Sequence, residues 1–397
     1  MRDRALIVSA SMGAGHDAVA AELARRLAAS GARAEVVDVL ALLPLRLGAL
    51  LRWWYRGVML RAPWLYALVY RVFFVSRRAP STSPLTVVAA AGLARAVRRV
   101  RPSLVVPVFH VAAQAAGHLR ARGRLAVPSA VVLTDFAVHR LWLHPGNDRY
   151  LCPDTATALA VTAAVGRPAF RCAPIVRPGF GAPGAHVTDG ADVTGRADVT
   201  RGRGADAAEV RARIGLRDGD RIVLVCAGSW GVGRVAETAR LLARSGRYAP
   251  VVLCGRNERL RRRLGRLLGR AGAGAALGWR DDLADLLASA YALVDNAGGL
   301  TCREAFAAGV PVVTYRPIAG HGRDGVLAMA RAGVSVHARR RADLLRALDR
   351  LEPGLPGRAA LTARAAALFT SAPAESLLLP DLLLPGHAVP RPCEPAP

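Results

Sequence analysis

A glycine turn between an apolar strand and a helix, within residues 294–313 (VDNAGGLTCREAFAAGVPVV), is well suited to hold a phosphate. Gly298 and Gly299 free the backbone, Thr301 is a candidate helix cap, and Glu304 lies one turn inside the helix. N–H groups at a helix start have no partner within the helix and point at an anion, while a carboxylate there can accept hydrogen bonds from sugar hydroxyls. An ordinary strand–helix crossover with a tight turn is the alternative interpretation.

A second glycine turn lies near the start of the chain, where residues 5–16 (ALIVSASMGAGH) run from an apolar strand into an alanine-rich helix. Gly13 and Gly15 form the turn, and His16 stands at the mouth of the helix. The turn lacks the Gly-Lys-Ser/Thr of a Walker A loop and the third glycine of a dinucleotide fingerprint, which argues against nucleotide hydrolysis and NAD chemistry. His16 is either a capping or core residue or a group that faces a ligand, since open α/β sheets bind ligands just after their strands.

The elements that position these turns are short apolar runs alternating with alanine-rich stretches, a pattern that predicts parallel sheets covered by helices. Strands are expected at 5–9, 34–40, 103–109, 129–136, 221–228, 249–255, 291–296 and 310–315. Helices are expected after the turn at Gly13 and Gly15 and at 85–99, 111–122, 234–244, 257–270, 282–289 and 301–308. The predicted fold class is therefore α/β, with two doubly wound, Rossmann-like domains at residues 1–176 and 215–370.

Two ranges lie outside the predicted domains. Residues 177–214 form a linker that includes a low-complexity insertion at 181–206, where Ala-Asp-Val-Thr occurs twice among Gly, Arg and Asp and few large apolar groups are present. Residues 371–397 form a proline-rich tail, which we expect to sustain no helix and to hang free or pack loosely.

The composition agrees with a cytoplasmic protein of two domains. A chain of 397 residues, 52% of them hydrophobic, is long enough to bury two cores. The formal net charge is +26, but all 55 basic residues are Arg, and we attribute part of this excess to coding bias rather than to nucleic-acid binding. The six cysteines show no CxxC or metal-ligand spacing, as expected of reduced, buried thiols. No basic-then-apolar leader precedes the first strand, so secretion is not expected.

A segment rich in Arg and aromatic residues interrupts the first domain at residues 46–78. It holds seven Arg, no acidic residue and eight of the 21 aromatic residues. No run of about 18 uncharged residues occurs in it, so it should not span a bilayer. Such helices suit an anionic membrane surface, with rings at the headgroups and guanidinium groups on phosphates. A pair of core helices with a solvated Arg face is an alternative, and stacking on single-stranded nucleic acid is another.

With these features the chain resembles the GT-B glycosyltransferases that include monogalactosyldiacylglycerol synthases, bacterial processive diacylglycerol glucosyltransferases and, more distantly, the lipid II-forming N-acetylglucosaminyltransferase. The resemblance rests on the Gly-His turn, the Arg-aromatic insert and the segment DNAGGLTCREAFAAGVPVV. The most specific match is TDFAVHRLWLHPGNDRYLCP (134–153), which is similar to the family's Thr-Asp-x-x-x-His-x-x-Trp stretch and the Asp-x-Tyr strand after it. The resemblance as a whole covers residues 5–176 and 215–340.

The resemblance implies an inverting glycosyltransferase that moves a hexose from a UDP-sugar to a membrane lipid acceptor such as diacylglycerol. Glu304 would bind the ribose hydroxyls, and the glycine turn would lie beneath the diphosphate. The expected donor-binding residues are Ser229, Gly231, Gly233, Arg234, Gly298, Gly299, Leu300, Thr301, Glu304 and His321. His321 stands where relatives usually carry a Gln-containing stretch that contacts the sugar, so the identity of the sugar stays open.

The N-terminal domain would bind the acceptor and supply a base for its hydroxyl, an effect worth on the order of 10²–10⁴ in rate. The candidates are His16 and Asp135, which lies at the end of strand 129–136. Asp135 is either the base or the group that orients a histidine, or it only caps a helix. The other expected acceptor and membrane residues are Gly13, Gly15, Arg52, Trp53, Trp54, Arg56, His139 and Trp142.

No metal cofactor is expected. Asp218-Gly219-Asp220 spells the Asp-x-Asp of metal-using transferases, but it lies between a helix and a strand, where a turn is expected. The expected partners are a UDP-sugar, a lipid acceptor and an anionic membrane surface, without nucleic acid, and the expected location is the cytoplasmic face of the membrane. A UDP-sugar epimerase of the same architecture, or a non-catalytic lipid- or nucleotide-binding relative, remains an alternative.

Overall fold

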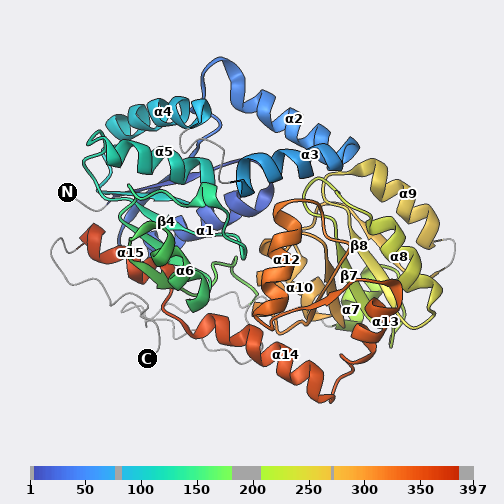
Figure 1. The fold of residues 1–397 in the computed structure, drawn as a ribbon. Helices are drawn as coiled ribbons and strands as arrows, with labels where there is room; N and C mark the ends of the chain where they lie inside the picture. The colour runs from blue at the N-terminus through green and yellow to red at the C-terminus, as the bar shows by residue number, and fades with distance from the viewer. Residues whose placement is uncertain (1–3, 77–82, 181–206, 270–271, 384–397) are drawn as a thin grey trace.

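The chain forms two α/β halves that lie side by side, as the computed structural model in Figure 1 shows. The structure describes residues 4–76, 83–180, 207–269 and 272–383. The insertion predicted at 181–206 therefore lies outside the described residues. The five cysteines within the described residues are buried, as their apolar surroundings predicted.

The N-terminal half is built on two three-stranded parallel sheets, ordered β2-β1-β3 and β4-β5-β6 and joined by a parallel bridge between Val105 and Ser129. The strands are β1 (Arg4–Ser9), β2 (Arg33–Asp38), β3 (Leu104–Pro107), β4 (Ala130–Val132), β5 (Arg149–Cys152) and β6 (Ala169–Arg171). The covering helices are α1 (Ala14–Ala29), α4 (Pro84–Val100), α5 (His110–Ala121) and α6 (Thr155–Val165). Because the strand order reverses between β1 and β3, a crevice opens at their carboxyl ends.

The C-terminal half is one six-stranded parallel sheet, ordered β12-β11-β10-β7-β8-β9. The strands are β7 (Ile222–Cys226), β8 (Ala249–Leu253), β9 (Ala275–Leu277), β10 (Ala292–Asp295), β11 (Val312–Tyr315) and β12 (Val336–Ala338). The helices are α7 (Ala207–Arg213), α8 (Val235–Arg244), α9 (Glu258–Gly269), α10 (Leu283–Ala288), α11 (Leu300–Ala307), α12 (His321–Arg331), α13 (Arg341–Asp349) and α14 (Pro356–Ala366). Here the strand order reverses between β7 and β10, so a second crevice opens at the carboxyl ends of these two strands. The two predicted donor loops, one after β7 and one after β10, begin at this crevice.

The prediction that the tail beyond residue 370 forms no helix is wrong for α15 (Ala374–Leu383). Pro380 lies inside this helix, but Ala374, Leu377, Leu378 and Leu382 are buried against the core of the N-terminal half. Their burial offsets the backbone hydrogen bond that the proline removes. The red helix α15 accordingly lies beside the N-terminal half in Figure 1. The tail from residue 384 lies outside the described residues.

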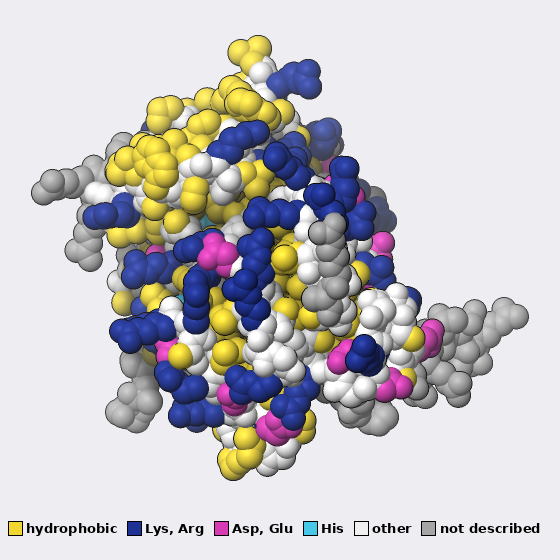
Figure 2. Space-filling view, turned by 90° about the vertical axis from the view of Figure 1, so that its right-hand side faces the viewer, with side chains coloured by type: hydrophobic (Ala, Val, Ile, Leu, Met, Phe, Trp, Pro, Cys, Tyr) yellow, Lys and Arg dark blue, Asp and Glu magenta, His cyan; other side chains and the backbone are white. Residues whose placement is uncertain are grey.

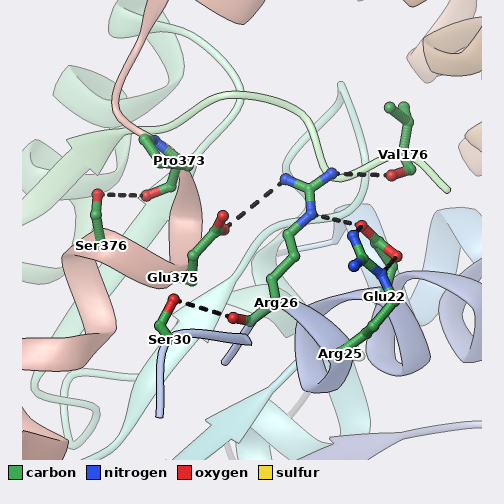
Figure 3. Close-up of polar contacts among 8 residues, drawn as sticks. All are labelled: Glu22, Arg25, Arg26, Ser30, Val176, Pro373, Glu375 and Ser376. Carbon is green, nitrogen blue, oxygen red and sulfur yellow. Dashed lines mark hydrogen bonds and ion pairs between the residues drawn. The ribbon is translucent and has the colours of Figure 1, made fainter. Parts of the chain in front are cut away.

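The chain therefore crosses between the halves twice, after β6 and again before α15. The two crossing segments are hydrogen-bonded to each other, from the amide of Ala173 to the carbonyl of Ala372 at 2.9 Å. Arg26 of α1 holds both segments: its guanidinium donates to the carbonyl of Val176 at 2.9 Å and lies 3.8 Å from the carboxylate of Glu375 (Figure 3).

The Arg-aromatic segment forms a helical hairpin along the top of the molecule (Figure 1), which we call the aromatic hairpin. It comprises η1 (Pro44–Arg46), α2 (Leu47–Arg61), α3 (Pro63–Tyr70) and η2 (Arg71–Val75). One face is buried, with Val58, Met59, Tyr66 and Tyr70 packed against Val232 and Ile318 of the C-terminal half.

The opposite face of the aromatic hairpin is exposed. Trp53 is 71% exposed and Trp64 is 70% exposed, and Leu68, Val72, Phe73 and Val75 are exposed beside them. Figure 2 shows hydrophobic side chains gathered at the top of the molecule, with arginines just below. Among the described residues no single helix is long and apolar enough to cross a bilayer. Pro44–Arg61 and Pro63–Val75, which meet at a bend of 118°, together have the length and apolar composition of a span.

Candidate active-site cleft

A cleft of about 520 Å³ lies between the halves, at the carboxyl ends of the strands where both sheets reverse their order. Its walls come from both glycine turns, from the loop after β4, from the aromatic hairpin and from the start of α12. The predicted residues that the cleft brings together are Gly13, Gly15, His16, Trp54, Asp135, His139, Ser229, Gly298, Gly299, Leu300, Thr301, Glu304 and His321.

The imidazole of His16 is held in one tautomer. Its Nδ1 lies 3.2 Å from the carbonyl oxygen of Val108 and 3.0 Å from the hydroxyl of Thr134. Because a carbonyl oxygen only accepts, Nδ1 carries the proton and Nε2 keeps its lone pair. Burial lowers the pKa of His16, and the negative charge of Asp135 raises it only in part. His16 is therefore neutral at neutral pH and able to accept a proton.

Asp135 neither caps a helix nor bonds His16. Its carboxylate accepts a hydrogen bond from Nε1 of Trp142 at 2.8 Å, and Trp142 is fully buried. Trp142 therefore positions Asp135 from behind the cleft wall and does not line the cleft, contrary to its expected place in the acceptor site. Asp135 acts on His16 through its charge.

Three further histidines line the cleft and are held neutral. Burial lowers the pKa of His139 to about 3 and places the pKa of His110 well below its ordinary value. Burial also lowers the pKa of His321, which belongs to the C-terminal half. The Nδ1 of His139 is buried without a hydrogen-bond partner among the described residues. Neutral imidazoles can donate to and accept from hydroxyl groups, so this wall suits an uncharged, hydroxylated ligand.

The glycine turn at Gly298 and Gly299 is shaped by Asp295 at the end of β10. Its carboxylate accepts from the amides of Ala297 and Gly298 at 2.7 and 2.6 Å, and Gly298 has a φ of 69°, which favours glycine. Helix α11 begins after Gly299 with no side-chain cap, so Thr301 does not cap it as expected. The amides at the start of α11 are left available to a ligand.

Glu304 is almost fully buried, with 1% of its surface exposed, and pairs with Arg177. The Nε of Arg177 donates to its carboxylate at 2.7 Å. Burial raises the pKa of Glu304, while the hydrogen bond and charge of Arg177 lower it. Arg177 follows β6 of the N-terminal half, so this ion pair joins the two halves at the wall of the cleft.

Several predicted residues lie outside the cleft wall. Gly231, Gly233 and Arg234 of the loop after β7 do not line it, and Arg234 instead pairs with Glu237 at 2.6 Å on the surface. The loop turns away because Gly231 and Gly233 take positive φ values of 65° and 97°. Of the predicted hairpin residues, Trp54 reaches the cleft, whereas Arg52, Trp53 and Arg56 do not line it.

The cleft residues that were not expected from the sequence include Thr134, Arg177 and Arg303. Two of them carried a weak signal in the sequence. Thr134 begins the Thr-Asp-x-x-x-His-x-x-Trp match, and Arg303 is a charged residue within the apolar helix TCREAFA. Arg177 carried none, because its contact with Glu304 joins segments 127 residues apart.

The described residues contain no group of three or more His, Cys, Asp or Glu that could hold a metal ion. Asp218-Gly219-Asp220 lies away from the cleft in a turn, where Gly219 has a φ of 88° and the carboxylate of Asp220 accepts from the amide of Arg217 at 2.8 Å. Metal independence stays a prediction.

The sequence is similar to known membrane-lipid glycosyltransferases. A family model for monogalactosyldiacylglycerol (MGDG) synthase matches residues 16–165. The processive diacylglycerol beta-glucosyltransferase of Bacillus pumilus is 26% identical over 259 residues, which are 63% of this chain and 58% of that protein. The enzyme of the same name from Bacillus cereus is 27% identical over 239 residues, 59% of this chain and 56% of that protein. The matched region thus spans less than two thirds of these relatives.

The fold is that of solved glycosyltransferases over nearly the whole chain. The glycosyltransferase SnogD from Streptomyces nogalater has a TM-score of 0.55 at 17% identity and covers 95% of this chain and 97% of its own. MurG from Acinetobacter baumannii has a TM-score of 0.51 at 15% identity, over 96% of this chain and 99% of its own. The predicted GT-B fold is thereby confirmed, and over residues 16–165 the sequence is similar to the MGDG synthase family.

Proposed function

We propose that the protein is an inverting glycosyltransferase that moves a hexose from a UDP-sugar to the hydroxyl of a membrane lipid such as diacylglycerol. The observation that carries the proposal is the position of His16 and Glu304 on the walls of one cleft, one from each half. The solved structure of Anabaena HepE in complex with UDP-glucose, whose fold is similar at a TM-score of 0.52, supports a UDP-sugar as the donor class.

The acceptor is activated by His16 on this proposal. The Nε2 lone pair takes the proton of the lipid hydroxyl while the hydroxyl oxygen attacks the anomeric carbon. The carbonyl of Val108 and the hydroxyl of Thr134 keep the ring in the required tautomer, and Asp135 stabilises the imidazolium that forms. A single displacement inverts the anomeric configuration and gives a β-linked sugar from an α-linked donor.

The donor lies against the C-terminal half. The ribose hydroxyls donate to the carboxylate of Glu304, which requires that Arg177 shares or leaves this group. The amides at the start of α11 donate hydrogen bonds to the diphosphate, and His321 faces the sugar. Fixed dipoles at this helix start favour the charge that develops on the departing UDP.

The acceptor reaches the cleft from a membrane surface that binds the aromatic hairpin. The exposed Trp53 and Trp64 suit the headgroup region, and Arg52, Arg56 and Arg61 suit lipid phosphates. Tyr66 of the same hairpin lines the cleft, so the membrane contact and the reaction site are adjacent. An exposed apolar face favours a lipid acceptor over the soluble substrates of an epimerase. We accordingly expect a peripheral protein of the cytoplasmic membrane.

The test is a product assay with purified protein and four donors, namely the UDP derivatives of glucose, galactose, N-acetylglucosamine and glucuronic acid. Each is incubated with and without diacylglycerol in mixed micelles, and lipid products are identified by mass spectrometry and their anomers by NMR. We expect a β-linked glycolipid, and a loss of at least tenfold in turnover for His16→Ala. A matched control is His337→Ala, a histidine of the C-terminal half that does not line the cleft. No lipid-linked product from any donor would sink the proposal.

A further inference from the structure

One of the three arginines that line the cleft has guanidinium nitrogens without a partner. Arg177 pairs with Glu304, and Nε of Arg280 donates to Asp282 at 2.6 Å. Arg303 differs, because its Nε and Nη2 are buried and form no hydrogen bond within the described residues. Within the part of the chain that the structure describes, the cleft therefore contains an arginine with two buried guanidinium nitrogens that form no hydrogen bond.

This arrangement is unfavourable for the empty protein. Arg303 is only 3% exposed, and burial lowers its pKa. Its guanidinium carbon lies 5.1 Å from the ring centre of Phe136. A cation–π contact offsets part of the desolvation of a charge but satisfies none of its N–H groups. A buried, unpaired guanidinium is thus a candidate ligand-binding group.

Two helix starts lie near Arg303, and the negative charge of Asp135 also acts on its guanidinium and raises its pKa. Helix α11 begins at Leu300, one turn before Arg303, and the 16-residue helix α1 begins close by, since a Cβ placed on Gly15 would lie 3.6 Å from Cβ of Leu300. The starts of the two helices, each with unpaired amides and a positive dipole end, therefore meet beside the guanidinium. A group with two negative charges fits this place better than a single carboxylate.

We infer that Arg303 is a catalytic residue that binds the diphosphate of the nucleotide-sugar donor and neutralises the charge that appears on it as the sugar leaves. This inference rests on the proposed function. The donor's diphosphate fits this site better than a lipid phosphate does, because Arg303 belongs to the same helix as Glu304, the expected ribose ligand.

The transfer breaks one bond at the anomeric carbon and forms another. The bond between the anomeric carbon and the β-phosphate oxygen breaks, and its electron pair goes to that oxygen. The acceptor oxygen bonds to the carbon, and its proton goes to Nε2 of His16. Arg303 donates hydrogen bonds to the departing diphosphate and offsets the negative charge that develops on it.

The test compares the binding of UDP and of uridine by isothermal titration calorimetry in wild type, Arg303→Gln and Arg303→Lys. We expect Arg303→Gln to weaken UDP by at least tenfold and uridine by less than threefold, with Arg303→Lys in between. The matched control is Arg358→Gln: Arg358 is also partly buried against an aromatic ring, that of Tyr291, but does not line the cleft. It should leave the affinity ratio of UDP to uridine unchanged.

A second readout separates ligand binding from a structural role. Without ligand, Arg303→Gln should melt at the same temperature as wild type or higher, because it removes an unpaired buried charge. Saturating UDP should then stabilise wild type more than the variant. A lower melting temperature with equal losses for UDP and uridine overturns the inference and makes Arg303 a structural residue.

The outcomes also separate this inference from the proposed function. If wild type binds UDP and Arg303→Gln binds it equally well, the inference fails alone. If Arg303→Gln loses only binding to phosphatidylglycerol vesicles, the phosphate belongs to a lipid and the inference also fails. If UDP binding depends on Arg303 but no lipid-linked product forms, the proposed function fails alone. A wild type that does not bind UDP contradicts both.

Discussion

The hydroxyl of Tyr66, on the aromatic hairpin, lies 2.7 Å from Nδ1 of His321, the first residue of α12 in the other half. Tyr70 donates to the carboxylate of Asp324 at 2.9 Å one turn further along. Gly320 allows this approach, because a Cβ at that position would lie 2.7 Å from the ring of Tyr66. The segment proposed to bind the membrane thus contacts the residue proposed to face the donor sugar.

Tyr66→Phe should raise the KM for the UDP-sugar about fivefold, since a neutral hydrogen bond contributes about 1 kcal/mol. Its ring would still pack against Tyr55 and Tyr70, so the fold should be kept. Steady-state kinetics with varied donor measures the effect. Tyr248→Phe is the control, because it removes a hydrogen bond to Asp349 far from the cleft. An unchanged KM would show that His321 does not depend on Tyr66.

Asp135→Asn should move the acidic limb of the kcat/KM profile to lower pH. His16 accepts a proton only when neutral, and the charge of Asp135 raises its pKa. Removing that charge lowers the pKa further, so activity should persist at more acidic pH, while the Asn oxygen still accepts from Trp142. Asp17→Asn, which removes a weaker influence on the same pKa, should cause a smaller shift. A shift to higher pH in Asp135→Asn would contradict the assignment of His16 as the base.

Glu304→Gln should abolish the preference for a ribose with free hydroxyls. In wild type we expect UDP to bind at least tenfold more tightly than 2′,3′-dideoxy-UDP, because a buried carboxylate accepts hydrogen bonds strongly. In Glu304→Gln the two affinities should differ by less than threefold. Calorimetric titration with both ligands measures this, and Arg303→Gln serves as the contrast, since it should weaken both ligands alike. Retention of the full preference in Glu304→Gln would show that another group binds the ribose.

Changing Arg52, Arg56 and Arg61 to Glu should reduce co-sedimentation with phosphatidylglycerol vesicles at least tenfold. Each arginine near an anionic surface contributes about 1 kcal/mol. The control changes Arg341, Arg346 and Arg350, which are exposed residues in and directly after α13, to Glu. It alters the net charge equally, and α13 lies at the lower right of Figure 1, whereas the hairpin lies at the top. Equal losses in both triple variants would point to overall charge rather than to the hairpin.

Leu378→Ala should lower the free energy of unfolding by about 2–5 kcal/mol, as expected for a fully buried leucine. Denaturant unfolding followed by circular dichroism measures the loss. Leu355→Ala provides the comparison, because Leu355 is 42% exposed and should change stability by less than 1 kcal/mol. Equal, small effects would mean that α15 does not pack on the N-terminal half in solution.

The positions of the two glycine turns were predictable because each follows an apolar strand, and in both sheets these strands lie where the strand order reverses. Strand ends were less predictable. The run 129–136 is apolar throughout most of its length, but β4 ends at Val132, because Thr134 and Asp135 turn into the cleft. An apolar run shows which residues are buried and does not show where the hydrogen-bonded ladder stops.

The remaining features depend on contacts between segments far apart in the chain. The proline-rich composition of the tail concealed α15, whose leucines have a helical spacing that becomes meaningful only against α1. Arg303 looked like any helix arginine until Phe136 of the other half covered it. Arg234 looked like a phosphate ligand because the sequence does not reveal that two positive-φ glycines turn its loop outward.

The hydrogen bond between Ala173 and Ala372 links the two segments of chain that join the halves. Two linked segments resist torsion more than a single segment does, so we expect any relative motion of the halves to be a hinge motion about these two residues. Such a motion would have to break the hydrogen bonds of Tyr66 with His321 and of Tyr70 with Asp324, which makes these two tyrosines a latch between the halves.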